Sequence, residues 1–173
     1  QETPPHPSEY LALVKERLAG HDLTLVLEPG RSIAANAGIF VTKTILTKTN
    51  KDQHFAIVDG AMNDLIRPSL YGAWQNIIPV DTTEKPGQIE ASFDIVGPVC
   101  ESGDFLGKAR TLRIQEGDLL AVRSAGAYGF VMGSNYNTRG RAPEILVDQD
   151  QVHLIRERET IDSLWALEHT VDD

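Results

Sequence analysis

The spacing of apolar residues predicts a helix and then a buried strand at the start of the chain. Residues 1–7 are polar and rich in proline, which indicates a loop. Ser8 offers an N-cap to a helix whose apolar residues recur every three or four positions, and Gly20 ends that helix. Residues 23–27, Leu-Thr-Leu-Val-Leu, form an apolar run of strand length that Pro29 closes. A helix followed by a buried strand is half of an α/β unit.

Beyond residue 38 the pattern changes to many short strands. Residues 31–37 are rich in alanine and flanked by two glycines, which predicts a short helix. Turns rich in Gly, Pro, Asn and Asp then separate runs of β-branched and apolar residues. These runs predict strands over residues 40–47, 54–58, 76–80, 91–96, 119–122, 144–147 and 152–155. Only residues 63–71 and 160–168 of this region have helical spacing, the latter with Thr160 as N-cap.

We therefore expect a mainly β protein with two parts. Residues 1–38 would be the end of an α/β domain, because they hold one helix and one buried strand. Residues 39–173 would form a β-domain that includes the final helix, 160–168. Many short strands at spacings set by turns favour an antiparallel barrel or sandwich.

Composition and charge exclude several partners. The chain has 41% hydrophobic and 24% charged residues, as soluble globular proteins do, and no apolar run approaches the roughly 18 residues of a membrane span. The net charge of −9 opposes contact with a phosphate backbone, and Arg139 and Arg141 are the nearest approach to a basic cluster. We expect neither a membrane nor nucleic acid as a partner.

The single cysteine and the N-terminus predict the compartment. One cysteine excludes an internal disulfide, so nothing suggests an oxidising environment. The sequence starts without methionine and without a signal-like segment. We expect a cytoplasmic protein that has been cut from a longer chain.

That cysteine, Cys100, is the first candidate for chemistry. A lone cysteine is more often a small buried hydrophobe than a catalyst. Here Pro98 precedes it and Glu101-Ser102-Gly103-Asp104 follows, which places it at a strand end where a loop can expose it. Thiols titrate near about pH 8.5 and can donate a proton at neutral pH. Both interpretations stay open from these residues alone.

Residues 28–31, Glu-Pro-Gly-Arg, predict an anion site at the end of the first strand. α/β folds bind ligands at such ends, Gly30 allows close approach of the backbone, and Arg31 adds a forked cation. A phosphate or a carboxylate would suit these groups. The alternative is a surface turn with a solvated arginine.

Two more segments could hold an anion. Arg67 and Tyr71 are four residues apart and would share a helix face, although an amphipathic helix would show the same spacing. Tyr128 lies between Gly126-Ala127 and Gly129, a weak motif that matches neither a P-loop nor a dinucleotide fingerprint. The five histidines have no metal-ligand spacing, so we expect no metal site.

Taken together and in order, four segments resemble the diaminopimelate decarboxylases, a family within the alanine-racemase-like (fold type III) group of pyridoxal-phosphate enzymes. The segments are 28–32 (Glu-Pro-Gly-Arg-Ser), 58–68 (Val-Asp-Gly-Ala-Met-Asn-Asp-Leu-Ile-Arg-Pro), 97–104 (Gly-Pro-Val-Cys-Glu-Ser-Gly-Asp) and 126–129 (Gly-Ala-Tyr-Gly). Four ordered motifs are more specific than any one of them.

The resemblance implies a fold and an activity. Residues 1–38 would be the last helix and strand of a (β/α)₈ barrel that binds pyridoxal 5′-phosphate, and 39–173 the C-terminal β-domain. The enzyme would decarboxylate meso-2,6-diaminopimelate to L-lysine and CO₂, the last step of lysine biosynthesis. It would work as a homodimer with active sites shared between subunits.

The resemblance also assigns cofactor contacts. Glu28 would face the pyridinium nitrogen and keep the ring protonated. Gly30, Arg31 and Tyr128 would lie at the cofactor phosphate, with Arg31 and Tyr128 also contacting the substrate.

The substrate and its proton donor follow from the same resemblance. Arg67, Tyr71 and Glu101 would hold the far end of the substrate, where an ammonium and a carboxylate share one carbon. Cys100 would protonate the carbanion in the partner subunit's active site. Related decarboxylases of ornithine or arginine usually carry Cys-Asp in place of Cys100-Glu101, so the pair favours a substrate with a distal carboxylate.

The chain departs from the family in lacking part of the site. The family's Schiff-base lysine and its glycine-rich phosphate loop lie earlier in the barrel, so the chain alone is expected to be inactive. No matching motif surrounds Lys15, Lys43, Lys48, Lys51, Lys85 or Lys108. Thr138-Arg139-Gly140-Arg141 also lacks the proline that the family often has between the arginines. The alternatives are a stand-alone β-domain for binding or dimerisation, or a decarboxylase of another basic amino acid.

Overall fold

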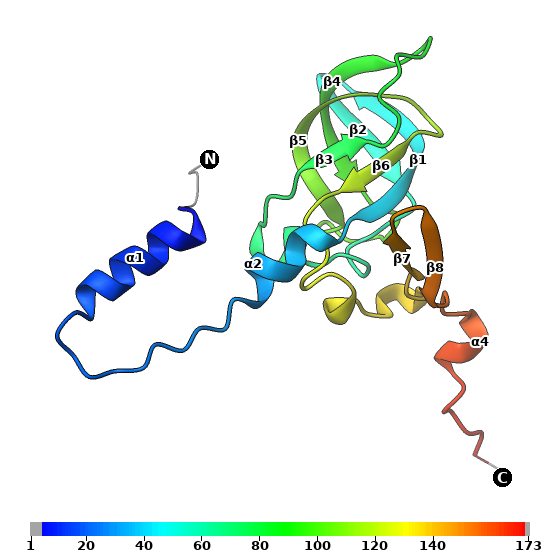
Figure 1. Cartoon of the computed structure of the whole chain (residues 1–173). Helices are drawn as coiled ribbons and strands as arrows, with labels where there is room; N and C mark the ends of the chain where they lie inside the picture. Colours follow the sequence, from blue (N-terminus) through cyan, green and yellow to red (C-terminus); the bar gives the residue numbers. More distant parts are fainter. Residues whose placement is uncertain (1–4, 172–173) are drawn as a thin grey trace.

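A computed structural model describes residues 5–171, and a curled sheet forms its centre (Figure 1). Its strands are β1 (Phe40–Asn50), β2 (Gln53–Val58), β3 (Ile77–Pro79), β4 (Ile89–Val96), β5 (Phe105–Ile114) and β6 (Leu119–Val122). They lie in the order β3-β6-β1-β2-β4-β5, and the outer strands β3 and β5 contact each other. The sheet is therefore a nearly closed barrel, as the short strands predict.

One pair of strands departs from the antiparallel expectation. β2 and β4 run parallel, with His54 opposite Phe93, while every other neighbouring pair in this sheet is antiparallel. Parallel neighbours need a long crossover. The chain between β2 and β4 provides one, because it contains a short helix, α3 (Arg67–Tyr71), and β3.

The barrel interior is filled by apolar side chains from all six strands and one turn. The cluster consists of Ala56, Val58, Leu65, Ile77, Phe93, Ile95, Leu106, Leu112, Ile114, Leu120 and Val122, with Phe40 packed against it. Side chains along a strand point alternately inward and outward, so these residues recur at every second position over much of the sheet. The large buried aromatic is Phe93, which is fully inaccessible.

β5 is the strand that the sequence pattern did not predict. Its apolar residues Leu106, Leu112 and Ile114 are buried, while Lys108 and Arg113 between them face outward. A register shift between β4 and β5 and the left-handed backbone of Ala109 (φ 51°) interrupt the alternation. The charges and the bulge together mask the period of two.

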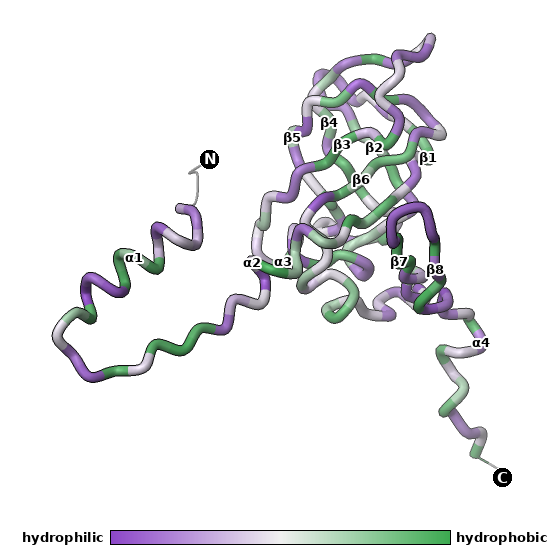
Figure 2. The backbone as a smooth tube through the Cα atoms, viewed as in Figure 1, coloured by the Kyte–Doolittle hydropathy of each residue, from purple (hydrophilic) through white to green (hydrophobic). Residues whose placement is uncertain are grey.

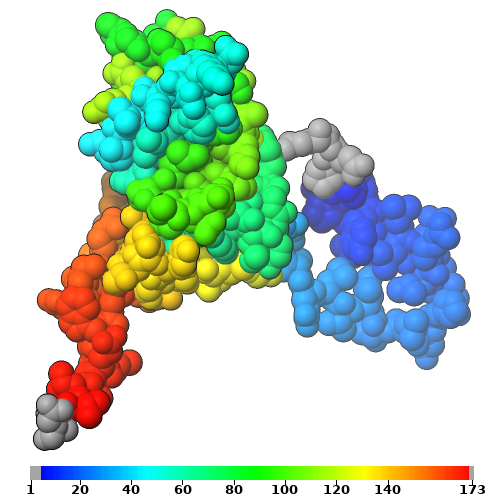
Figure 3. All heavy atoms as spheres, turned by 180° about the vertical axis from the view of Figure 1, so that it is seen from behind, coloured from blue at the N-terminus to red at the C-terminus, as the bar shows by residue number. Residues whose placement is uncertain are grey.

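Residues 5–29 lie away from the barrel (Figures 1 and 3). The helix α1 (Pro7–Arg17) buries no residue, and the side chain of His6 caps it, not that of Ser8. The expected strand at 23–27 is wrong, because these residues are extended but exposed and unpaired within the described chain. Figure 2 shows that this segment is largely apolar. An apolar run becomes a strand only where a neighbouring strand accepts its hydrogen bonds.

The next segment is fastened to the barrel by its backbone. α2 (Gly30–Ala34) and the 3₁₀ turn Ala35–Ala37 form the short helix that the alanines predict. The backbone N–H of Gly126 donates to the carbonyl of Ala35 over 3.0 Å, and that of Ala125 donates to Gly38 over 2.9 Å. These bonds bring residues 30–38 against residues 124–126.

Gly126→Ala is expected to destabilise the fold by about 2 kcal/mol, the usual size for a side chain forced into a closely packed contact. The added methyl would lie 2.7 Å from the backbone nitrogen of Gly38 and closer still to the carbonyl oxygen of Ala34, and backbone atoms cannot move aside. Urea unfolding of the variant measures the loss. Gly30→Ala, where the methyl meets nothing within 4 Å, is the control. Equal stability of the two variants would contradict this packing.

The C-terminal part forms a separate two-stranded hairpin. β7 (Glu144–Asp148) and β8 (Gln151–Arg156) pair antiparallel, as predicted, and follow the short 3₁₀ turns Phe130–Met132 and Tyr136–Thr138. α4 (Ile161–Leu164) has Thr160 as its N-cap, as expected, but ends four residues earlier than the pattern suggested. Among residues 5–171 no helix is both long enough and apolar enough to cross a membrane.

Candidate functional site

α3 presents the first two candidate residues at one end of the barrel. The helix begins at Arg67, four residues later than the sequence pattern predicts, because Ala61–Leu65 form a turn closed by Asp64. The Asp64 carboxylate accepts the backbone N–H of Ala61 over 2.9 Å. Pro68 then suits the first turn of a helix, where its missing N–H is not needed.

Arg67 lies between two tyrosine rings. Its guanidinium carbon is 5.3 Å from the ring centre of Tyr71 and 5.6 Å from that of Tyr128. The shared face of Arg67 and Tyr71 is therefore confirmed, and Tyr128, 57 residues away from Tyr71 in the chain, joins them. Both rings are half exposed. A cation with two phenols at a surface can bind a carboxylate or a phosphate.

Tyr128 is held in a backbone conformation that favours glycine. Its φ is 57°, in the left-handed region. Such a conformation costs about 1–3 kcal/mol for a residue with a side chain and concentrates at functional sites. Its neighbour Gly129 has no side chain to strike the carbonyl of Ala125. The two glycines of this segment thus allow the turn that aims Tyr128 at Arg67.

Cys100 and Glu101 lie in the loop between β4 and β5, and a buried carboxylate shapes that loop. Asp104 accepts the backbone N–H of Val99 and that of Met62, each over 2.7 Å and each on a different oxygen. Asp104 is 4% exposed, whereas Cys100 is exposed. The position of Cys100 beyond a strand end, open to solvent, is as the sequence predicts.

The same loop is tied to α3. The hydroxyl of Ser69 donates to the carbonyl of Gly103, with a longer contact of 3.4 Å to that of Phe105. Ser69 lies two residues from both Arg67 and Tyr71. The loop of Cys100 and the helix of Arg67 are therefore held as one unit.

Asp104→Asn is expected to lower the free energy of unfolding by about 1–3 kcal/mol, the cost of a buried unpaired donor. The amide keeps one acceptor oxygen, so the N–H of either Val99 or Met62 would face an NH₂ group. Chemical unfolding measures the change. Asp52→Asn makes the same charge change at an exposed turn, and equal stability of both variants would show that Asp104 does not fasten the loop.

α2 carries Arg31, and the residues that follow α2 are bonded to this region. The hydroxyl of Ser124 donates to the side chain of Asn36 over 2.7 Å, in addition to the two backbone bonds that join residues 35–38 to 125–126. Arg31 lies one helical turn before Ala35, and Tyr128 two residues after Gly126. The segments of Arg31 and Tyr128 are neighbours, and α2 and α3 lie together at one end of the barrel (Figure 2).

Gly30 and Glu28 make few contacts with the rest of the described chain. Gly30 is the first residue of α2, and nothing within 4 Å would meet a side chain there. Glu28 is in the exposed segment before α2, and within the described residues it forms no ion pair. Its contact with a pyridinium nitrogen stays a prediction, as do the contacts of Gly30 and Arg31 with a phosphate.

A polar network that the sequence did not predict supports the turn at 59–65. Arg139 donates through Nη2 to the carbonyl of Asp59 over 2.6 Å and through Nε to Asn63 over 3.0 Å. Its Nη2 is also 3.7 Å from Asp64, whose pKa is raised by burial. The sequence suggested at most a weak basic cluster here. Arg139 instead holds the turn that leads into α3.

Arg141 is likewise structural. It donates to Glu159 over 2.8 Å and to Asn135 over 3.1 Å. Hydrogen bonds from the Arg141 backbone and from Asn135 hold the pKa of Glu159 below its usual range. The pair closes the loop ahead of the hairpin, so the two arginines do not form a basic surface patch.

The assembled groups suit one side of a cofactor pocket. Arg67, Tyr71 and Tyr128 offer a cation and two hydroxyls, and Arg31 adds a cation beside a helix start. Glycine at 126 and 129 leaves the backbone bare beside Tyr128. These cations and hydroxyls could bind the phosphate of pyridoxal phosphate and a carboxylate of the substrate. Segments 28–32, 58–68, 97–104 and 126–129 contain no lysine, so they offer no amine for covalent attachment of the cofactor. Among residues 5–171 no group of three acidic, His or Cys side chains could hold a metal ion.

Comparisons with known proteins identify the family to which the chain is similar. Residues 21–126 match the family model described as pyridoxal-dependent decarboxylase, C-terminal sheet domain. The chain is 58% identical to diaminopimelate decarboxylase of Vibrio cholerae, over 99% of this chain and 41% of that protein. It is 57% identical to diaminopimelate decarboxylase of Pseudomonas aeruginosa, over 95% of this chain and 39% of that protein.

A solved structure is similar over nearly the whole chain. Diaminopimelate decarboxylase of Helicobacter pylori, crystallised with L-lysine, superposes with a TM-score of 0.84 at 39% identity, covering 96% of this chain and 41% of that one. The chain thus spans about two fifths of the length of the proteins that it matches.

Proposed function

This chain belongs to the pyridoxal-dependent decarboxylases as their C-terminal sheet domain, and from this premise we propose that it completes the active site of a diaminopimelate decarboxylase. The reaction would release CO₂ from meso-2,6-diaminopimelate and yield L-lysine. The observation that carries the proposal is the convergence of α2, α3, the Cys100 loop and the Tyr128 turn. Identities of 57–58% to proteins of that name support it.

Arg31, Tyr128 and Glu28 would hold the cofactor. Pyridoxal phosphate, when bound, supplies a ring that accepts the electron pair left by the departing carboxylate. Arg31 and Tyr128 would donate hydrogen bonds to its phosphate, beside the bare backbone of Gly30. Glu28 would keep the ring nitrogen protonated.

Arg67, Tyr71 and Glu101 would orient the substrate. The guanidinium and the phenol would bind the distal carboxylate, and the Glu101 carboxylate would bind the ammonium on the same carbon. A related substrate without that carboxylate would leave Arg67 without a partner. This is the basis for preferring diaminopimelate to another basic amino acid.

Cys100 would deliver the proton. Its thiol is exposed on the loop that Asp104 and Ser69 hold against α3. We place this thiol in the active site of a partner subunit, where it would protonate the α-carbon once CO₂ has left. The proposal therefore includes a homodimer in the cytoplasm, with each site built from two chains.

Activity of the complete protein tests the proposal. The full open reading frame that contains this chain is expressed, loaded with pyridoxal phosphate and assayed for CO₂ release from meso-diaminopimelate. Release from this substrate, with ornithine and arginine at least tenfold poorer, is the expected result. A folded, cofactor-loaded protein that releases no CO₂ would overturn the proposal and leave a binding or dimerisation module as the alternative.

A further inference from the structure

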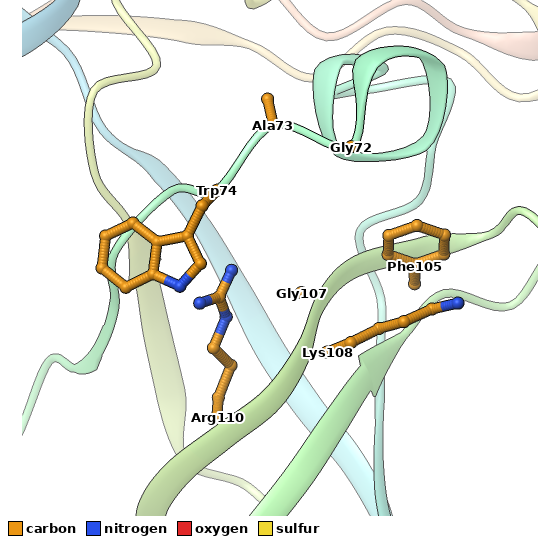
Figure 4. A pocket seen from close by; sticks show the side chains of 7 residues that line it. All are labelled: Gly72, Ala73, Trp74, Phe105, Gly107, Lys108 and Arg110. Atoms are coloured by element: carbon orange, nitrogen blue, oxygen red, sulfur yellow. The ribbon is translucent and has the colours of Figure 1, made fainter. Parts of the chain in front are cut away.

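A small hollow on the barrel, separate from the groups described above, contains a buried arginine. Arg110 lies on β5 at a position that faces inward, and only 9% of its surface is exposed. The hollow has a volume of about 240 Å³ and is lined by residues 72–74 after α3 and by Phe105, Gly107, Lys108 and Arg110 of β5. Figure 4 shows the Arg110 guanidinium against the indole of Trp74, with Lys108 and Phe105 opposite.

In the part of the chain that the structure describes, no carboxylate pairs with the charge of Arg110. Four other arginines have a carboxylate within 4.0 Å, namely Arg113, Arg139, Arg141 and Arg156. Within residues 5–171, Arg110 forms neither an ion pair nor a side-chain hydrogen bond, and its Nε is buried without a partner. The hollow has no acidic lining residue, and burial lowers the pKa of Arg110. A buried cation in this state is destabilising until an anion joins it.

Aromatic contacts hold this cation in place. The guanidinium carbon is 4.6 Å from the ring centre of Trp74, and the absence of a side chain at Gly107 leaves room for Nε and Nη2. On the other side, the ammonium of Lys108 lies 4.2 Å from the ring centre of Phe105. The hollow thus combines two cations with two aromatic rings, in a chain whose net charge is −9.

We propose that Arg110, with Lys108, Trp74 and Phe105, forms an anion site that takes a carboxylate attached to an apolar or aromatic body. The terminal nitrogens of a guanidinium match the two oxygens of a carboxylate. The rings supply flat apolar surface for the body of the ligand. The carboxylate is carried either by a free small molecule or by an acidic side chain of the complete protein that lies outside this chain.

Calorimetric titration of the complete protein with benzoate tests the site, with benzamide as a neutral ligand of the same shape. We expect benzoate to bind at least tenfold more tightly than benzamide. Arg110→Met, which keeps an unbranched side chain, should weaken benzoate at least tenfold. Arg113→Met, which removes an exposed arginine of the same strand, should leave benzoate binding unchanged. The comparison of the two ligands needs no variant and holds even if Arg110→Met fails to fold.

A crystal structure of the complete protein separates the two sources. If benzoate does not bind, a carboxylate of the protein within hydrogen-bond distance of Arg110 supports the site and identifies its occupant. If benzoate does not bind and no carboxylate reaches Arg110, the proposal is wrong and the residue only stacks on Trp74. Equal affinity for benzoate and benzamide, or full benzoate binding by Arg110→Met, would also overturn it. None of these results depends on decarboxylase activity.

Discussion

Cys100→Ala in the complete protein is expected to lower kcat by about 10²–10⁴-fold, the usual size for the loss of a general acid. The structure places this thiol in the open, on a loop whose backbone is fixed by the buried carboxylate of Asp104. Without the thiol, water must supply the proton from a less favourable position. Cofactor binding should not change, because no part of Cys100 is assigned to the cofactor. Single-turnover assays with meso-diaminopimelate measure the effect.

The matched control for this prediction is Ser102→Ala. Ser102 is exposed on the same loop and has no assigned role. Its loss should leave kcat within about twofold. If Cys100→Ala behaves like Ser102→Ala, the thiol does not take part in the reaction.

Arg67→Met is expected to lower kcat/KM for meso-diaminopimelate on the order of 10²-fold, mainly through KM. Truncating one partner of a desolvated ion pair costs about 2–5 kcal/mol. The structure holds Arg67 between the rings of Tyr71 and Tyr128, so the guanidinium is positioned before the substrate arrives. Methionine keeps contact with both rings but cannot pair with the distal carboxylate. Steady-state kinetics of the variant give the change.

Two comparisons make this prediction specific. Arg123→Met removes another exposed arginine, and its KM should not change. L-lysine, the product, keeps the distal carboxylate, whereas 1,5-diaminopentane lacks it. As a competitive inhibitor of Arg67→Met, L-lysine should therefore bind much more weakly than to the unchanged protein, and the binding of 1,5-diaminopentane should weaken far less. Equal losses for both ligands would show that Arg67 does not recognise that carboxylate.

The sequence predicts the strands of the barrel well where apolar and β-branched residues cluster. β1, β2, β4 and β6 fall where those runs occur. Apolar and β-branched residues both favour strands and are buried in the barrel, so the two effects act together. β5 escapes notice because Lys108, Arg110 and Arg113 break up its apolar pattern. Residues 23–27 show the opposite error. Their apolar character is real, but strand formation depends on a neighbour that the described chain does not contain.

In the candidate site, too, some contacts could be predicted from the sequence and others could not. The partnership of Arg67 and Tyr71 follows from helical spacing alone, and the exposure of Cys100 follows from its place after a strand. The contact of Tyr128 with Arg67 joins residues 61 positions apart, so local spacing could not show it. Local spacing also could not show the hydrogen bond from Ser69 to Gly103 or the hydrogen bonds by which Arg139 stabilises the turn at 59–65. The nearby glycines, Gly126 and Gly129, are the local signal that marks Tyr128 in the sequence, whereas its left-handed backbone is seen only in the structure.

The central claim is that these surfaces form one half of a pyridoxal phosphate pocket whose lysine lies elsewhere in the protein. A crystal structure of the complete protein with bound pyridoxal phosphate tests it most directly. We predict Arg31 and Tyr128 within hydrogen-bond distance of the phosphate, Glu28 at the ring nitrogen, and Cys100 facing the cofactor bound by the partner subunit. A cofactor bound out of reach of Arg31, Tyr128 and Glu28 would contradict the account.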